Sequence, residues 1–197
     1  MIHLIVVMKM KELLDIVDEL GNPTGKVVER EIAHQKGIRH RTSHVWLVRK
    51  RNNKVQVLLQ KRSHNKDSFP DCYDISSAGH IPAGQDYAES ALRELYEELG
   101  YRAKSEDLIY CGKRSFRLDE NFHHREFHDF QVSAIYMIWL DLQETDFRLQ
   151  KEEVSSVKWL DLDECMQAVK NNTIKHCIYL DELEIIYKKI IDIHTAK

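Results

Sequence analysis

Residues 79–101 of this chain read GHIPAGQDYAESALRELYEELGY, a loop with glycines at both ends followed by an acidic amphipathic stretch. The apolar residues of its second half recur at helical spacing and predict one buried stripe: Ala88, Ala91, Leu92, Leu95 and Leu99. Gly100 follows the last of them, where a helix commonly ends on a residue that tolerates a left-handed backbone. The stretch therefore predicts a loop that leads into a helix ending near residue 99.

Three carboxylates crowd the last turns of this predicted helix. Glu94 and Glu98 are four residues apart, and like charges at that spacing destabilise a helix by about 0.2–0.5 kcal/mol. Arg93 has the right spacing to pair with Glu97, which would offset one of the charges. A divalent cation would offset the rest, because Mg²⁺ takes oxygen ligands while keeping several waters. A solvated acidic face is the alternative that composition alone leaves open.

The spacing of these residues resembles the signature of the Nudix hydrolases, in which a glycine precedes a glutamate-rich helix at a fixed distance. Gly79 takes the first position, and residues 93–101, RELYEELGY, take the helical part. The one departure is Gln85, which stands where the family has its first glutamate. In the family that glutamate mainly braces the loop against the helix, and an amide can still hydrogen-bond there. The resemblance implies a metal-dependent hydrolase of diphosphate bonds.

A closer resemblance covers residues 12–165. Residues 60–63, QKRS, and residues 69–80, FPDCYDISSAGH, resemble the isopentenyl-diphosphate-isomerase-like branch of this superfamily. The true isomerases carry a cysteine immediately before the Gly-His pair, where this chain has Ala78, and they tend to lack the full Arg-Glu-x-x-Glu-Glu set that is present here. The resemblance therefore implies an isomerase-like scaffold with hydrolase chemistry.

The resemblance also implies roles for particular residues in an attack of water on phosphorus, assisted by Mg²⁺ or Mn²⁺. The expected metal ligands are Glu94, Glu97, Glu98 and the backbone carbonyl of Gly79. Glu94 or Glu126 is expected to be the base, since Glu126 aligns with the isomerase catalytic glutamate, and Glu98 and Arg93 complete the catalytic set. Arg93 is expected to orient the glutamates.

Other residues are expected to meet the substrate or a second cation. Lys61, Arg62 and His80 are the predicted substrate contacts. His34, His40 and His80 lie near the positions of the isomerases' metal-binding histidines, although the spacing between the first two is one residue short. Structural or substrate-contact roles for these histidines stay open beside metal binding.

Composition limits the class of protein. A chain of 197 residues with 43% apolar and 31% charged residues fits one globular domain over residues 1–197. Its net charge of −3 provides no basic surface for a nucleic-acid polymer or an anionic membrane. The four cysteines form no CxxC pair, which favours free thiols and a cytoplasmic protein. Residues 1–10 are apolar at their start but too short to span a bilayer. They are expected to be a disordered or wrongly assigned extension, with Met8 or Met10 as the alternative start.

The remaining pattern predicts an α/β protein. Strands are expected over residues 13–18, 26–28, 44–48, 55–59, 73–78, 108–116, 130–142 and 154–160. Two closing helices are expected, one from about residue 161 to 171 and one whose apolar stripe would also suit a homodimer interface: Tyr179, Leu183, Ile186, Ile190 and Ile193. The whole predicts a Nudix-type α/β/α sandwich with a mixed β-sheet and an N-terminal β-hairpin extension at residues 11–30.

Three functions are weighed. The leading one is a metal-dependent pyrophosphohydrolase acting on a nucleotide-type or other organic diphosphate. The second is an isomerase of a prenyl diphosphate, which Ala78 disfavours. The third is a catalytically silent binding module, which only Gln85 favours. Activity with Mg²⁺ and its loss in Glu98→Gln would separate the first from the third.

Overall fold

The central feature of the computed structural model, which describes residues 11–122 and 124–195, is a mixed β-sheet. Its strands are β3 (His40–Arg51), β4 (Lys54–Arg62), β5 (Tyr73–Asp74), β6 (Ser77–His80), β7 (Ile109–Phe122), β8 (Arg125–Trp139) and β9 (Val154–Asp161). The strand order is β5-β4-β3-β8-β7, with β6 paired to β3 and β9 paired to β4. β3 and β8 run parallel and the other pairs antiparallel, as a mixed sheet requires.

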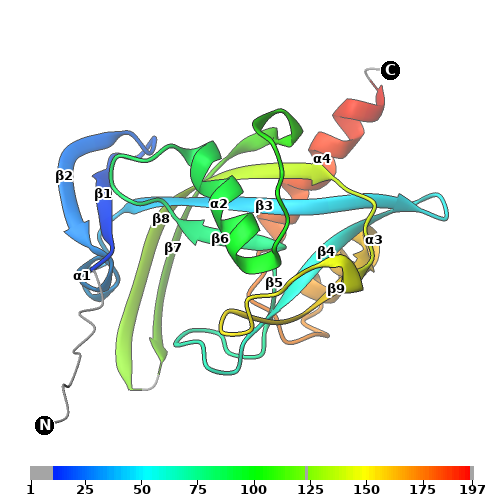
Figure 1. Ribbon diagram of the computed structural model, residues 1–197. Helices are drawn as coiled ribbons and strands as arrows, with labels where there is room; N and C mark the ends of the chain where they lie inside the picture. The colour runs from blue at the N-terminus through cyan, green and yellow to red at the C-terminus, as the bar shows by residue number, and fades with distance from the viewer. Residues whose placement is uncertain (1–10, 123, 196–197) are drawn as a thin grey trace, which may run out of the picture.

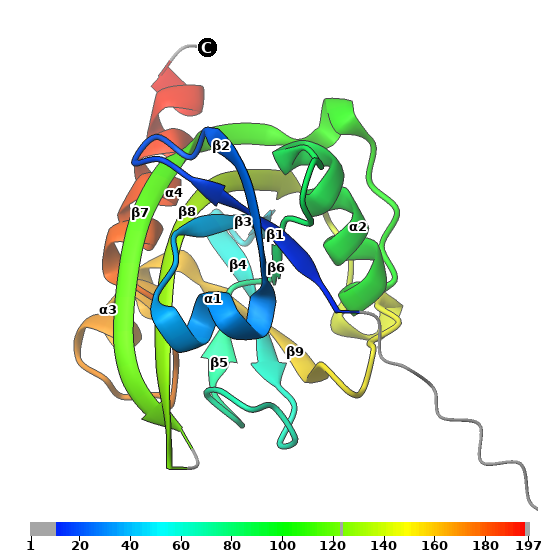
Figure 2. The same cartoon turned by 90° about the vertical axis from the view of Figure 1, so that its left-hand side faces the viewer.

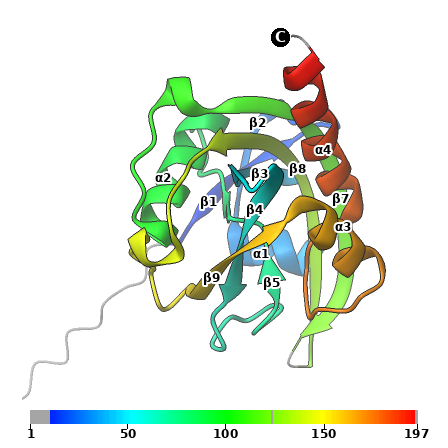
Figure 3. The ribbon, with the colours of Figure 1, turned by 90° about the vertical axis from the view of Figure 1, so that its right-hand side faces the viewer.

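Helices cover both faces of this sheet. α2 (Tyr87–Leu99) lies on one side, and α3 (Leu162–Lys170) and α4 (Leu180–Thr195) lie on the other (Figure 3). Successive side chains of a strand point to opposite faces, so β3 supplies both cores. Val45 and Leu47 pack in the core under α2, whereas Trp46 and Val48 pack in the core under α3 and α4. This arrangement confirms the predicted α/β/α sandwich.

The predicted helices at the end of the chain are present. α3 covers the expected range, and α4 turns the predicted apolar stripe toward the sheet, where Leu183, Ile186 and Ile190 are buried. None of the helices in the described ranges is both long and apolar enough to span a bilayer.

The N-terminal hairpin is a separate two-stranded sheet of β1 (Leu13–Val17) and β2 (Pro23–Glu29), as predicted. α1 (Arg30–Lys36) follows it directly and has no counterpart among the predicted elements. The hairpin and α1 lie together at one end of the molecule (Figure 1), and Figure 2 looks onto this end. The predicted extension at residues 1–10 lies outside the described residues.

The region predicted as one strand over residues 73–78 is broken into two. β5 ends at Asp74, and β6 begins at Ser77 on a different neighbour. Ser76 between them is fully buried; its Oγ accepts a hydrogen bond of 2.8 Å from the Leu47 N–H and donates one of 2.6 Å to the Leu58 carbonyl. β6 pairs with residues 42–45 of β3 and β4 with residues 48–51, and this serine hydroxyl bonds the backbones of β3 and β4 at the fork between the two pairings.

The strands β7 and β8 are longer than predicted. The expected gap at residues 117–129 is instead the far part of their hairpin, paired in continuous register from Arg117 opposite Phe130 to Phe122 opposite Arg125. The exposed, polar composition of these residues concealed a strand pair. The long hairpin curves beside α1 (Figure 2).

Candidate active site

The site begins with the fit between Gly79 on β6 and Glu94 on α2. A Cβ built on Gly79 would stand 2.1 Å from Glu94 Cδ, so the carboxylate occupies the space a side chain would need. Asp86 caps α2 by accepting a hydrogen bond of 2.8 Å from the Ala88 N–H, and Gly100 ends the helix with a φ of 69°. The glycine at position 79 therefore allows a carboxylate of the helix to lie against the backbone of β6.

Glu98 lies at the fork where β4 and β6 diverge along one edge of β3. Its Oε2 accepts hydrogen bonds of 3.4 Å from Gln60 Nε2 on β4 and from the backbone N–H of Ala78 on β6. The residue is only 7% exposed. Since both bonds are long, this buried carboxylate is weakly satisfied by the protein.

Arg93 connects the carboxylates of the helix to β6. Its Nη2 lies 2.8 Å from Glu94 Oε1, and its Nη1 lies 2.9 Å from Glu97 Oε2 in the pair expected from their spacing. Nη2 also donates to the carbonyl oxygen of His80 at 3.3 Å. These contacts suit the orienting role predicted for Arg93.

Burial changes the acidity of the two inner carboxyls. It raises the pKa of Glu94 to about 7 and that of Glu98 to about 8, and in each case the neighbouring glutamates raise it further. Arg93 opposes the shift at Glu94, and the nearby Ser77 opposes it at Glu98. Both carboxyls are therefore held closer to neutrality than a solvated glutamate.

The loop before α2 is held by the N-terminal hairpin. Asp15 Oδ2 of β1 accepts hydrogen bonds from the Gly84 N–H at 2.8 Å and from Arg41 Nη2 at 2.7 Å. Arg41 Nη2 also donates to the backbone carbonyl of Gln85 at 2.9 Å. The side chain of Gln85 contributes one longer contact, with Ser90 Oγ 3.5 Å from its Oε1. A buried ion pair thus braces the loop at the point where the family signature has a glutamate.

Three histidines converge beside this loop. Their nitrogens lie within 4.8 Å of one another, with His34 Nε2 only 3.0 Å from His80 Nε2. His40 Nε2 lies 3.5 Å from Asp129 Oδ1, and both of these buried atoms lack a hydrogen bond within the described chain, as does His34 Nδ1. Burial lowers the pKa of all three imidazoles, that of His34 to about 3. Neutral imidazoles with open nitrogens are the form that binds metal ions.

The other predicted residues lie on β4 and β8, and of these Arg62 is close enough to Glu98 for the two charges to interact. Glu126 is near the tip of the β7–β8 hairpin, opposite Asn121, and its side chain is 83% exposed. Arg62 is committed to an ion pair of 3.1 Å with Asp74 and to hydrogen bonds with Ser68. Lys61 is partly buried on the same strand. The structure thus brings His80 close to the helix carboxylates and leaves Glu126 on the hairpin tip.

Asp129, the acidic residue beside His40, is not among the predicted site residues. Asp129, Gln131 and Ser133 take alternate positions of β8, which places a polar row on one face of the strand. That alternation is a readable signal in the sequence. The parallel pairing of β8 with β3, in which His40 lies opposite Gln131, is a long-range contact that the sequence does not reveal.

The helix carboxylates suit a divalent cation. Glu94, Glu97, Glu98 and the carbonyl of Gly79 supply oxygen atoms only, which is the donor set of Mg²⁺ and Mn²⁺. The long hydrogen bonds of Glu98 leave its buried lone pairs open to a stronger partner. The histidine cluster offers nitrogen donors and suits a softer ion such as Zn²⁺.

Comparison with known proteins identifies the family. The NUDIX domain model matches residues 39–180. A Nudix hydrolase of Clostridium acetobutylicum is 35% identical over 163 residues, covering 82% of this chain and 75% of that protein. An isopentenyl-diphosphate Delta-isomerase of Pectobacterium atrosepticum is 28% identical over 152 residues, covering 77% and 78% of the two chains.

A solved structure agrees at the level of the fold. The protein DR0079 from Deinococcus radiodurans aligns with a TM-score of 0.65 at 18% identity, covering 88% of this chain and 98% of that one. The hydrolase relative confirms the predicted enzyme class. Together the two relatives confirm the predicted resemblance to Nudix hydrolases and to isopentenyl-diphosphate isomerases. Because the family model spans well over half of the residues, this chain belongs to the Nudix family.

Proposed function

We propose that this protein is a metal-dependent pyrophosphohydrolase that cleaves an organic diphosphate by attack of water on phosphorus. The observation that carries the proposal is the packing of Glu94 against Gly79, with Glu98 buried one helical turn further on at the fork between β4 and β6. Phosphoryl transfer requires positioned charge more than covalent chemistry from the protein. A helix that presents carboxylates against a strand backbone supplies such a position.

The residues take distinct roles in this proposal. Glu97 and Glu98 would hold the cation together with the Gly79 carbonyl, and Arg93 would keep Glu94 and Glu97 oriented. A bound Mg²⁺ or Mn²⁺ would neutralise diphosphate oxygens and acidify a water. Of the two predicted bases, the geometry favours Glu94, because Glu126 lies exposed on the hairpin tip. Glu94 would take the proton of the attacking water at its carboxylate.

The test is hydrolysis of a library of diphosphates with Mg²⁺ and with Mn²⁺, with products identified by mass. The library would hold nucleotide sugars, ADP-ribose, dinucleoside polyphosphates, coenzyme A, NADH and prenyl diphosphates. Glu97→Gln and Glu98→Gln should each lower the rate by about a hundredfold or more. Glu89→Gln, an exposed residue in the first turn of the same helix, is the matched control and should keep full activity. Binding without turnover across the library would instead identify a binding module.

The isomerase function keeps one observation in its favour, the convergence of His34, His40 and His80. Ala78 speaks against it, since the position before the Gly-His pair carries no thiol to exchange protons with carbon. The prenyl diphosphates of the library separate the two activities, because isomerisation leaves the mass of the substrate unchanged. We expect hydrolysis products and no double-bond isomer.

A further inference from the structure

A row of buried polar side chains crosses the sheet on the face that α3 and α4 cover. Thr42 of β3 and Ser133 of β8 lie opposite one another in parallel register, and Thr42 Oγ1 donates a hydrogen bond of 2.8 Å to Ser133 Oγ. His44 is the next residue of β3 on the same face and is only 8% exposed. Polar groups are costly to bury in a sheet, so their presence here calls for a partner.

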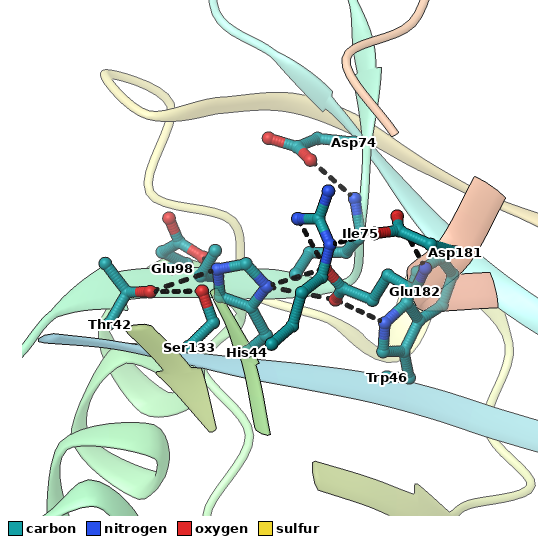
Figure 4. Close-up of polar contacts among 11 residues, drawn as sticks. Thr42, His44, Trp46, Asp74, Ile75, Glu98, Ser133, Asp181 and Glu182 are labelled. Atoms are coloured by element: carbon teal, nitrogen blue, oxygen red, sulfur yellow. Dashed lines mark hydrogen bonds and ion pairs between the residues drawn. The ribbon is translucent and has the colours of Figure 1, made fainter. Parts of the chain in front are cut away.

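The imidazole of His44 is fixed by a carboxylate from α4. Its Nδ1 lies 2.9 Å from Glu182 Oε1 and 3.0 Å from Oε2, and Trp46 Nε1 donates to the same carboxylate at 2.9 Å (Figure 4). Glu182 is 2% exposed, and Arg114 Nη1 lies 3.8 Å from its Oε2. Nδ1 therefore carries the proton that it donates to Glu182, and the ring has one orientation.

The opposite nitrogen of the same ring is poorly satisfied. Within the described chain, His44 Nε2 has one hydrogen-bond partner, Thr42 Oγ1 at 3.4 Å, and that hydroxyl already gives its proton to Ser133. Although burial lowers the pKa of His44, the Glu182 carboxylate outweighs it and raises the pKa above the usual value. When His44 is protonated, its Nδ1–H donates to the Glu182 carboxylate, while its Nε2–H faces the neutral Thr42 hydroxyl at a long distance. A neutral hydroxyl is a weak acceptor for a cationic donor.

Ala78 connects this donor to the helix carboxylates. Its Cα pairs with that of His44 across β3 and β6, and its backbone N–H donates to Glu98. Gly79, on which Glu94 packs, is the next residue. Asp74 lies close enough to contribute to the raised pKa of both His44 and Glu98. The strand position of His44 is therefore one residue pair away from that of Gly79, whose carbonyl is proposed to hold the cation.

We propose that His44 is a substrate-binding residue of this site, whose Nε2–H donates to an oxygen of the bound diphosphate, and that Glu182 is the positioning residue that holds its ring. This inference rests on the proposed function, since it takes a diphosphate as the ligand. A phosphoryl oxygen is the strong, anionic acceptor that Nε2 lacks in the protein alone. The cation and His44 would then hold the diphosphate from two sides.

The competing explanation is that the His44–Glu182 pair only anchors α4 to the sheet. Two substitutions of His44 distinguish this explanation from substrate binding. In His44→Asn the amide nitrogen falls near the position of Nδ1, so the bond to Glu182 survives and the Nε2 donor is lost. In His44→Gln the amide nitrogen falls near the position of Nε2, so a donor toward the site survives and the bond to Glu182 is lost. His194→Asn, near the end of α4, is the control for loss of a histidine.

The experiment is calorimetric titration of the full chain with methylenediphosphonate, a diphosphate that cannot be hydrolysed, in the presence of Mg²⁺. We expect His44→Asn to bind it about tenfold or more weakly, with unchanged affinity for Mn²⁺ alone and an unchanged melting temperature. His44→Gln should bind within about threefold of the wild type despite a lower melting temperature. Wild-type affinity in His44→Asn, or weaker binding in His44→Gln alone, would overturn the inference.

Two further measurements keep the outcome interpretable. In the wild-type protein, the Nε2–H resonance of His44 in histidine-labelled samples should shift when methylenediphosphonate is added, and an unmoved signal counts against the contact even if a variant fails to fold. Glu182→Gln should raise KM for any substrate found in the library more than it lowers kcat. If the wild type neither binds the diphosphonate nor hydrolyses the library, the proposed function fails and this inference with it. If it does both and His44→Asn matches it, the inference alone fails.

Discussion

At the scale of single residues, Gly79 has no space for a side chain. Its Cα lies so close to Glu94 that an added methyl carbon would stand 2.1 Å from the carboxyl carbon Cδ. The Glu94 side chain is packed between α2 and β6 and is paired with Arg93. Relieving the collision would therefore move a carboxylate of the candidate site.

We therefore expect Gly79→Ala to weaken Mg²⁺ binding by about tenfold or more, because the collision disturbs the Gly79 carbonyl, a proposed ligand, and loss of the groups that position a ligand costs affinity on that scale. Calorimetric titration with Mg²⁺ measures it. Gly25→Ala is the control, since Gly25 has open space around it and a φ of 81°. It should cost about 1–2 kcal/mol of stability through backbone strain and leave Mg²⁺ affinity unchanged. Equal Mg²⁺ affinities in both variants would contradict the assignment.

At the scale of secondary-structure elements, the N-terminal hairpin and the loop before α2 act as one unit. Asp15 and Arg41 are both mostly buried, and each bonds the backbone of the loop. Removing one partner of a buried ion pair leaves the other charge without compensation. The hairpin is therefore part of the site's support.

Asp15→Ala should lower the free energy of unfolding by about 3–5 kcal/mol, because it leaves Arg41 buried and unpaired. Denaturant titration followed by tryptophan fluorescence measures the loss. Asp18→Ala, in the exposed turn of the same hairpin, removes hydrogen bonds to Leu20 and Asn22 and should cost about 1 kcal/mol. A cost for Asp15→Ala as small as that of Asp18→Ala would show that the loop does not depend on the pair.

The same brace predicts the effect of restoring the family's glutamate. Gln85→Glu should change the rate of hydrolysis by less than about threefold, because the backbone of the loop is already bonded by Asp15 and Arg41. Steady-state kinetics on the substrate found in the library test this. A tenfold or larger increase in the rate would mean that the introduced glutamate contacts the cation directly, which the Asp15–Arg41 pair does not replace.

At the scale of the whole molecule, the buried carboxyls of Glu94 and Glu98 link stability to pH. Their pKa values are raised to about 7 and about 8, whereas the unfolded chain releases these protons near its ordinary value of 4.5. The stability they contribute is present in full below that ordinary value and is lost as the pH rises through the folded values. The loss has an upper limit of about 1.4 kcal/mol per pH unit for each group.

In the presence of EDTA, the free energy of unfolding should fall between about pH 5 and about pH 8 more steeply in the wild type than in Glu98→Gln. Since glutamine does not titrate, the difference between the two curves isolates Glu98. Saturating Mg²⁺ should reduce the difference, because a cation favours the ionised carboxylate. If the stability of the wild type and that of Glu98→Gln fell equally with pH, both with and without Mg²⁺, the result would contradict the burial of Glu98 and its place in the metal site.

The sequence was most informative where structure is local. The spacing from Gly79 to Gly100 predicted α2, its end and three residues of its buried stripe, Ala91, Leu95 and Leu99, whereas the predicted Ala88 and Leu92 are only partly buried. The β3–β4 hairpin was equally readable, since Asn52 and Asn53 accept the positive φ of a tight turn. The family resemblance then supplied the sandwich, which local patterns alone do not specify.

The rest depended on contacts between distant segments. Asp15 meets Arg41, and His44 meets Glu182, across pairs of elements that no periodicity connects. The far part of the β7–β8 hairpin was missed because its exposed residues lack an apolar face, although their backbones pair. Glu126 fell on that part, so its alignment with a catalytic residue did not place it near the carboxylates.

The parallel pairing of β3 with β8 also has a consequence for the route by which the protein becomes active. α2 and β7 both lie between these strands in the sequence, so Thr42 meets Ser133 only after a long loop has closed. The helix that carries the glutamates can form within its own residues. On dilution from denaturant, far-ultraviolet circular dichroism should recover early, and Mg²⁺ affinity should return only with the slow change in the fluorescence of buried Trp46.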